Sequence, residues 1–162
     1  MTPGRIGQRC AEKFGFSSEY ICLTSNYFGY MLEKAVEIGF RKLILAGHPG
    51  KLVKLAAGVF HTHNRMGDGR LEAMAAAAAV LDAPGMLVRD VFYSLTTEAA
   101  IQLIEQWEKK DEFWTLLAER AIEKISKYLF HEALVSLIFF NYQGQVLGLA
   151  DPGNLIGGLI NE

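Results

Sequence analysis

The chain has 162 residues, a formal net charge of −2 and 51% hydrophobic residues, a composition that excludes a disordered segment and favours a single folded domain. Its longest strongly apolar stretch, residues 133–140, is too short to cross a membrane, and no signal peptide opens the sequence. The near-neutral charge argues against a dedicated nucleic-acid binder, and the two cysteines, Cys10 and Cys22, suit a reducing cytoplasm.

The first half of the chain alternates predicted strands and helices. An apolar run predicts a short strand over residues 19–24, after which Ser25-Asn26 caps a helix that ends near Gly39. A second strand is predicted over residues 42–46, and the glycine-rich turn that follows it leads into a helix with apolar positions up to Phe60. This order of strand, helix, strand and helix predicts a parallel sheet.

The second half is richer in helices. Residues 62–69 are polar and predict a loop, and the periodicity then predicts helices over residues 70–81, about 97–110 and about 112–129. Two strands, 134–140 and 145–149, are joined by a short turn and are expected to be antiparallel, and the glycine-rich tail from Asp151 is expected to fray. We therefore predict a single α/β domain over residues 1–162, with a mainly parallel central sheet flanked by helices on both faces and a C-terminal antiparallel strand pair.

The charge is unevenly distributed along the chain. Residues 41–72 hold six basic residues against Asp68 and Glu72, a balance of +4. The same stretch is dense in glycine and histidine, which points to an anionic ligand, although a solvated charged face has the same composition.

The turn Gly47-His48-Pro49-Gly50-Lys51 stands between a predicted strand and a predicted helix. Free backbone N–H groups at a helix start, with a lysine beside them, favour an anion pocket. The turn is not a phosphate-binding P-loop, because only two residues separate its glycines and Leu52 follows the lysine. An ordinary strand-to-helix turn remains the alternative.

The loop from Thr62 to Glu72 carries more ionisable side chains than a connection requires. Arg65 and Arg70 are suited to hold carboxylates, and Asp68 or Glu72 is suited to orient them or to move protons. Loops with this much chemistry are usually functional.

Histidines in this region raise a metal-binding alternative. His61 and His63 share one metal ion only in an extended chain, and no third ligand stands at a suitable spacing, so we expect no metal site. His131 opens an apolar strand alone and is expected to be structural.

Together these motifs resemble the CbiD family, the cobalt-precorrin-5B C1-methyltransferases of anaerobic cobalamin biosynthesis. The resemblance covers residues 2–150 in order. It rests on Ser25-Asn26-Tyr27-Phe28-Gly29, on the run from Gly47 to Gly58, and on Thr62-His63 with Asp68, Arg70 and Glu72. The family loop usually has serine and alanine where this chain has Asn64 and Gly67. Family members also carry a preceding domain that this sequence lacks, so the chain looks like the C-terminal domain alone.

The resemblance implies methyl transfer from S-adenosylmethionine to C1 of a cobalt corrinoid, with cobalt only as part of the substrate. Because acetate and propionate groups fringe the macrocycle, Lys51, Lys54, Arg65 and Arg70 are expected to bind carboxylates. His48, His63 and Asp68 are the candidate catalytic residues. The remaining substrate-binding candidates are Asn26, Gly47, Gly50, Thr62, Asn64 and Glu72.

Two other functions stay open. A non-catalytic corrinoid- or anion-binding module fits a chain that lacks a partner domain, and a nucleotide- or phosphate-handling enzyme built on the Gly47–Lys51 turn is the weaker alternative. No nucleic acid or membrane is expected as a partner.

Overall fold

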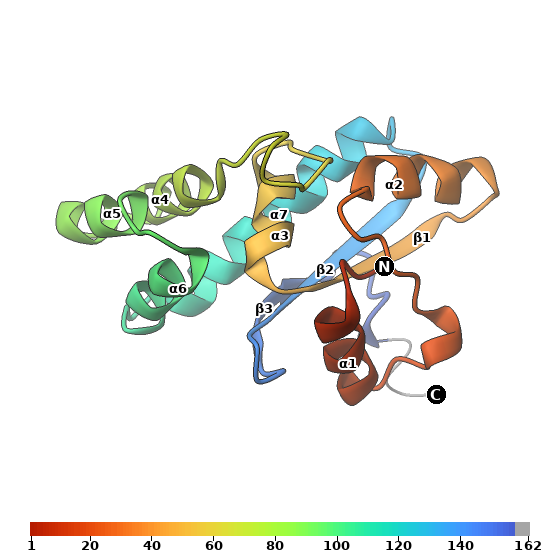
Figure 1. The fold of residues 1–162 in the computed structure, drawn as a ribbon, viewed down its shortest axis with the longest axis horizontal. Helices are drawn as coiled ribbons and strands as arrows, with labels where there is room; N and C mark the ends of the chain where they lie inside the picture. Colours follow the sequence, from red (N-terminus) through yellow and green to blue (C-terminus); the bar gives the residue numbers. More distant parts are fainter. Residues whose placement is uncertain (158–162) are drawn as a thin grey trace.

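The computed structural model describes residues 1–157 of the chain, as an α/β fold with a three-stranded sheet (Figure 1). The strands are β1 (Lys42–Gly47), β2 (Leu134–Phe140) and β3 (Val146–Ala150). The helices are α1 (Arg5–Phe14), the 3-10 helix η1 (Ser18–Tyr20), α2 (Phe28–Glu37), α3 (Pro49–Ala56), α4 (Arg70–Val80), α5 (Gly85–Phe92), α6 (Thr97–Glu105) and α7 (Lys110–Tyr128). Among these residues no helix is long and apolar enough to span a membrane.

The sheet is mixed rather than mainly parallel. Strands β1 and β2 pair in parallel from Lys42–Leu134 to Gly47–Phe139, and β2 and β3 pair antiparallel as predicted. The α/β class and these three strands are confirmed, but the strand expected over residues 19–24 is wrong. Only Leu23 makes a bridge there, to Thr2, and residues 18–20 form η1 instead.

The two faces of the sheet carry separate hydrophobic clusters. Leu45 and Leu137 face the larger cluster, which contains α3, α7 and the alanine-rich α4. Ala46 and Ile138 face a smaller cluster with Cys10 of α1. This alternation follows from the two-residue period of a strand. Figure 1 shows α1 on the opposite side of the strands from α3 and α7, while α4, α5 and α6 extend away to one side.

The N-terminal residues lie along the free edge of β1. Met1 N donates to Ile44 O at 2.7 Å, and Ala46 N donates to Met1 O at 3.0 Å. At the end of the strand, a Cβ on Gly47 would lie 2.8 Å from Pro3 Cδ, so glycine permits this close approach. The start of α1 is thereby held at the carboxyl end of β1.

The helices predicted from periodicity are confirmed, with different ends. The helix expected to reach Phe60 stops at Ala56, because Gly58 adopts a left-handed conformation with φ of +79°. Helices α1 and α5 are additions to the prediction. In α1, the buried residues Gly7, Cys10 and Ala11 have helical spacing, which is the signal that could have identified it.

The tail is fixed as far as the structure describes it. The Asp151 carboxylate accepts hydrogen bonds from the backbone N–H groups of Leu155 and Ile156, at 2.8 and 2.9 Å. Both side chains are buried, so fraying is wrong for residues 151–157. The rest of the tail lies outside the described residues.

Candidate functional site

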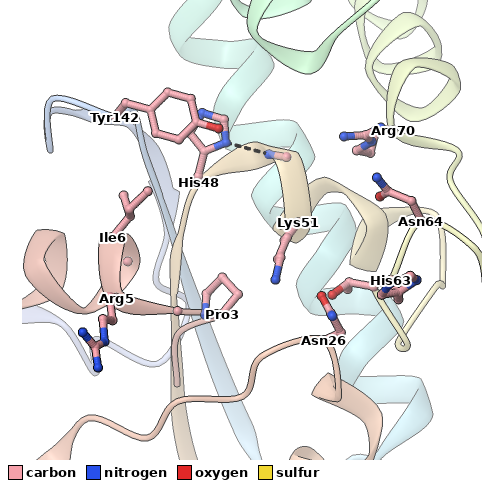
Figure 2. Close-up of a pocket in the computed structure, with 14 residues that line it drawn as sticks. Pro3, Arg5, Ile6, Asn26, His48, Lys51, His63, Asn64, Arg70 and Tyr142 are labelled. Atoms are coloured by element: carbon pink, nitrogen blue, oxygen red, sulfur yellow. Dashed lines mark hydrogen bonds between the residues drawn. The ribbon is translucent and has the colours of Figure 1, made fainter.

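A cleft of about 460 Å³ opens where the starts of α1 and α3 meet the loop before α4 (Figure 2). Three cationic side chains line it, from Arg5, Lys51 and Arg70, together with His48 and His63. Within the described chain, no aspartate or glutamate is among the lining residues. The lining is therefore suited to an anionic ligand.

The cleft brings together eight of the thirteen residues that the sequence singled out. They are Asn26, His48, Gly50, Lys51, Thr62, His63, Asn64 and Arg70. The other five are not among its lining residues: Gly47, Lys54, Arg65, Asp68 and Glu72. Of these, Arg65 and Glu72 are exposed, and Gly47 packs against Pro3.

His48 caps helix α3. Its Nδ1 accepts a hydrogen bond from Gly50 N–H at 3.0 Å, so the neutral ring carries its proton on Nε2, which donates to Glu98 Oε2 at 3.1 Å. The ring also stacks on Tyr142, with centroids 4.0 Å apart. Burial lowers the pKa of His48, and the nearby Glu98 carboxylate opposes this effect. Both ring nitrogens thus serve the local structure.

This cap changes the expectation for the Gly47–Lys51 turn. Pro49 has no N–H, Gly50 N–H is bound by the His48 ring, and Lys51 N–H donates to His48 O at 3.1 Å. The start of α3 therefore does not offer the free amides that the sequence suggested. What it does offer the cleft is the Lys51 side chain.

Lys51 reaches into the cleft without a protein partner. Its side chain points toward Pro3 and Asn26 in Figure 2, and among the described residues it makes no hydrogen bond or ion pair. Partial burial lowers the pKa of its ammonium group. An unpaired, partly desolvated ammonium group is suited to bind an anion.

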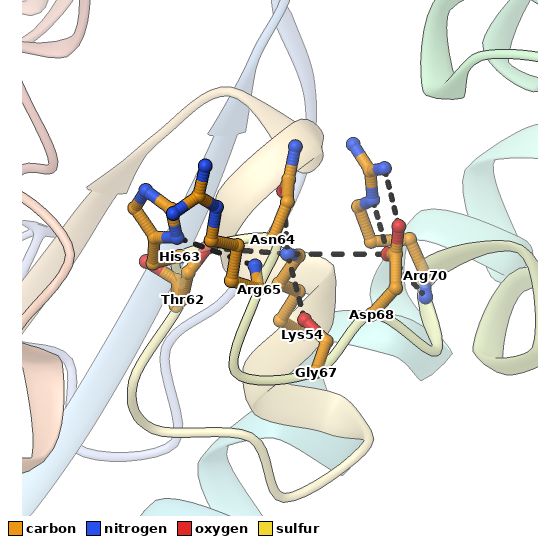
Figure 3. Close-up of polar contacts among 8 residues, drawn as sticks. All are labelled: Lys54, Thr62, His63, Asn64, Arg65, Gly67, Asp68 and Arg70. Atoms are coloured by element: carbon orange, nitrogen blue, oxygen red, sulfur yellow. Dashed lines mark hydrogen bonds and ion pairs between the residues drawn. The ribbon is translucent and has the colours of Figure 1, made fainter.

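Lys54, one turn further along α3, is fully buried and saturated (Figure 3). Its ammonium group donates to Thr62 O at 3.1 Å, Asn64 Oδ1 at 2.8 Å and Gly67 O at 3.0 Å. Burial lowers its pKa, an effect that Asp68, 4.0 Å away, opposes. With its three donors used, Lys54 organises the loop instead of reaching the substrate.

Asp68 is committed to Arg70. The guanidinium of Arg70 binds its carboxylate with two hydrogen bonds, Nε to Oδ1 at 2.5 Å and Nη2 to Oδ2 at 2.6 Å. These bonds hold the pKa of Asp68 below its usual range. The carboxylate therefore stays ionised and positions Arg70 at the cleft, a role that differs from the proton transfer considered above.

The polar segment before α4 contains hydroxyl and imidazole groups that can still form hydrogen bonds. The Thr62 hydroxyl lies on a side chain that is 2% exposed, and it has no hydrogen-bond partner in the described part of the chain. His63 Nδ1 accepts from Arg65 N–H at 3.2 Å. His61 and His63 have ring centroids 6.4 Å apart, and residues 1–157 contain no group of three potential metal ligands.

The residues that the sequence missed come from α1 and the β2–β3 turn. Pro3, Gly4, Arg5, Ile6 and Gly7 line one wall of the cleft. Tyr142, which lies 94 positions after His48 in the chain, covers the His48 ring. No local pattern pairs these segments with residues 48–70, because the sheet is what brings them together.

These features define an α/β domain with a cleft lined by cationic side chains. The CbiD C-terminal domain family matches residues 61–151, more than half of the chain, and this chain belongs to that family.

The curated relatives are longer proteins. The chain is 39% identical to a cobalt-precorrin-5B C(1)-methyltransferase of Photorhabdus laumondii subsp. laumondii, over 95% of this chain and 42% of the relative. It is 39% identical to the protein of the same name from Moorella thermoacetica, over 98% of this chain and 44% of the relative. The chain thus spans less than half the length of these relatives. No solved structure matches it.

Proposed function

We propose that this chain is the corrinoid-binding part of a cobalt-precorrin-5B C1-methyltransferase, and that its cleft holds the carboxylate-fringed edge of the macrocycle. The observation that carries the proposal is the lining of the cleft. It combines the unpaired Lys51 and the positioned Arg70 with no acidic residue among the described lining residues. This lining belongs to a chain whose curated relatives are named for a corrinoid substrate.

The residues divide into two roles in this proposal. Lys51 binds a substrate carboxylate directly. Arg70, whose guanidinium is oriented by its hydrogen bonds to Asp68, binds a second carboxylate. His63 and Asn64 complete the wall, while Lys54 and His48 hold the loop and the helix in place. Asn26 and Thr62 also line the cleft and position the macrocycle.

The methyl donor in this proposal is S-adenosylmethionine, which supplies an electrophilic methyl group on a sulfonium leaving group. The cleft does not fit the sulfonium, because three cationic side chains line it and no aspartate or glutamate is among its described lining residues. We propose that the donor site lies in the part of these longer proteins that this chain does not match. The free cysteines, Cys10 and Cys22, accord with a proposed cytoplasmic location.

The experiment compares the thermal unfolding midpoint of the chain with cobyrinic acid, S-adenosylmethionine or ATP, since a ligand of the folded state raises it. We expect cobyrinic acid to raise the midpoint of the wild-type chain and of Lys42→Met, but not of Lys51→Met. Lys42 is an exposed lysine at the far end of β1 and serves as the matched control. A midpoint that rises with ATP alone, or that rises with none of the three ligands, would contradict the proposal.

A second candidate, a non-catalytic corrinoid-binding part, follows from the limited coverage of the relatives. Incubation with S-adenosylmethionine carrying a labelled methyl group and a cobalt corrinoid separates the two. Transfer of the label indicates an active enzyme, whereas corrinoid binding without transfer indicates the binding part alone.

A further inference from the structure

We propose that the start of α1, together with Thr62 and Lys51, forms a carboxylate-binding subsite within the cleft. The inference rests on the proposed function for its ligand class and names the part of the chain that binds one carboxylate. The sequence suggested an anion pocket at the start of α3, with an ordinary turn as the alternative. The open amides lie instead at the start of α1, the other helix that begins at the cleft.

The start of α1 has the open amides that α3 lacks. Gly4 precedes the helix, and no side chain caps it. Within residues 1–157, the N–H groups of Arg5, Ile6 and Gly7 have no acceptor, whereas the next amide, on Gln8, donates to Gly4 O. All three residues line the cleft, and the first turn holds no acidic side chain. Uncapped amides and the positive end of the helix dipole favour an anion there.

The buried hydroxyl of Thr62 is the second and independent observation. Thr62 lines the same cleft, is 98% buried, and has no hydrogen-bond partner in the part of the chain that the structure describes. A buried hydroxyl without a partner costs free energy, so a ligand that accepts its hydrogen bond recovers that cost. Lys51 adds a positive charge, and Figure 2 shows its side chain directed toward Pro3, two residues before the start of α1.

A carboxylate suits this set of groups. It carries one negative charge and two oxygens, and it can accept at once from helix amides and from a side chain on the facing wall. The acetate and propionate groups of the corrinoid carry such carboxylates.

The main test places a competing carboxylate on the protein itself. Gly4 has extended backbone, with φ of 162°, and a Cβ there meets no described atom within 4 Å, so Gly4→Asp fits without strain. An aspartate at this position caps the open amides. We expect the unfolding midpoint to rise and the affinity for cobyrinic acid to fall about tenfold. Unchanged affinity would overturn the proposal.

Ser18→Asp is the control for overall charge. It adds the same charge at an exposed position of η1 that does not line the cleft. We expect it to leave the affinity for cobyrinic acid unchanged. An equal loss in both aspartate variants would assign the effect to net charge and contradict the subsite.

A matched pair of threonines tests the hydroxyl. Thr62→Val and Thr97→Val each remove a buried hydroxyl that lacks a partner among the described residues, but only Thr62 lines the cleft. We expect both variants to be at least as stable as wild type, because the unpaired group is removed. Only Thr62→Val should weaken cobyrinic acid binding, by about tenfold. Equal affinities in the two variants would contradict the role of Thr62.

Ligands without a macrocycle make the subsite testable apart from the proposed function. Titration with propane-1,2,3-tricarboxylate should shift the amide resonances of Ile6 and Gly7 in wild type and not in Gly4→Asp. Those shifts without any corrinoid binding would reject the proposed function and keep the subsite. Corrinoid binding that is unaffected by Gly4→Asp and Thr62→Val, with no amide shifts, would reject the subsite and keep the proposed function.

Discussion

The two lysines of α3 stand one turn apart and have opposite surroundings. Lys54 is fully buried, and its three donors are satisfied by the loop before α4. Lys51 lies in the cleft with no protein partner in the described chain. The same residue type thus builds the wall of a site at one position and faces the ligand at the other. What decides between the roles is whether protein or open space surrounds the ammonium group.

Lys54→Met should have the largest effect on stability. The change leaves Thr62 O and Gly67 O without their donor inside the protein, so we expect the free energy of unfolding to fall by about 3 kcal/mol. Urea unfolding of this variant and of Lys51→Met measures the difference. If both variants lose the same stability, the contrast between the two lysines is wrong.

The His48 cap at the start of α3 should contribute less to the free energy of unfolding than Lys54 does. His48→Ala removes the acceptor for Gly50 N–H, and we expect a loss of about 1–2 kcal/mol in the free energy of unfolding. His48→Asn keeps an acceptor at the cap and should recover most of this loss. Equal stability of the alanine variant and wild type in urea would contradict the capping role.

The same histidine predicts a pH dependence. Its pKa is lowered in the folded protein, so the unfolded chain binds the proton more readily. Stability is therefore complete above the unfolded pKa of about 6.5 and is lost as the pH falls from there toward the lowered folded value. His48→Asn should reduce this loss between about pH 7 and pH 5. An unchanged pH profile of the unfolding midpoint would contradict it.

Asp68→Asn should have the smallest effect on stability. The carboxylate is half exposed, and solvent screens its pair with Arg70, so we expect a loss below about 1 kcal/mol. Corrinoid binding should weaken more clearly than stability, because Arg70 loses the partner that orients it. A calorimetric titration tests this expectation, and a large loss of stability with unchanged binding would assign Asp68 to the fold alone.

The strongly periodic segments could be predicted from sequence, and the segments held by distant contacts could not. Strands β1 and β2 are apolar runs that are buried in the structure, and α7 shows helical spacing over its whole length. Residues 20–23 are apolar as well, but they lie beside Thr2 and not inside the sheet, and only Leu23 forms a bridge. Tyr20 and Leu23 are exposed, so an apolar run alone determined neither a strand nor burial here.

The candidate site shows the same division. The basic stretch 41–72 supplies half of the residues that line the cleft, and the sequence identified it from its charge, its glycine and histidine content and the family resemblance. The sequence could not separate Lys51 from Lys54, because both stand on one short helix with similar neighbours. The opening Thr2-Pro3-Gly4 with Gly7 resembles a turn of the family, but the sequence did not assign the start of α1 to the site, because its amides are not side chains and leave no mark in composition.

Sequence by itself determined the α/β class, the antiparallel end of the sheet, the family resemblance and the positive segment that carries the site. Tertiary structure alone decided which donors remain available to a ligand. The His48 ring accepts from Gly50 N–H, the His48 carbonyl accepts from Lys51 N–H, and the loop before α4 uses the donors of Lys54. Within the described residues, the first amides of α1, the Thr62 hydroxyl and the Lys51 ammonium group remain available to a ligand. The physical reason is that a polar group binds a ligand only where the fold has not already supplied its partner, and such partners come from distant parts of the chain.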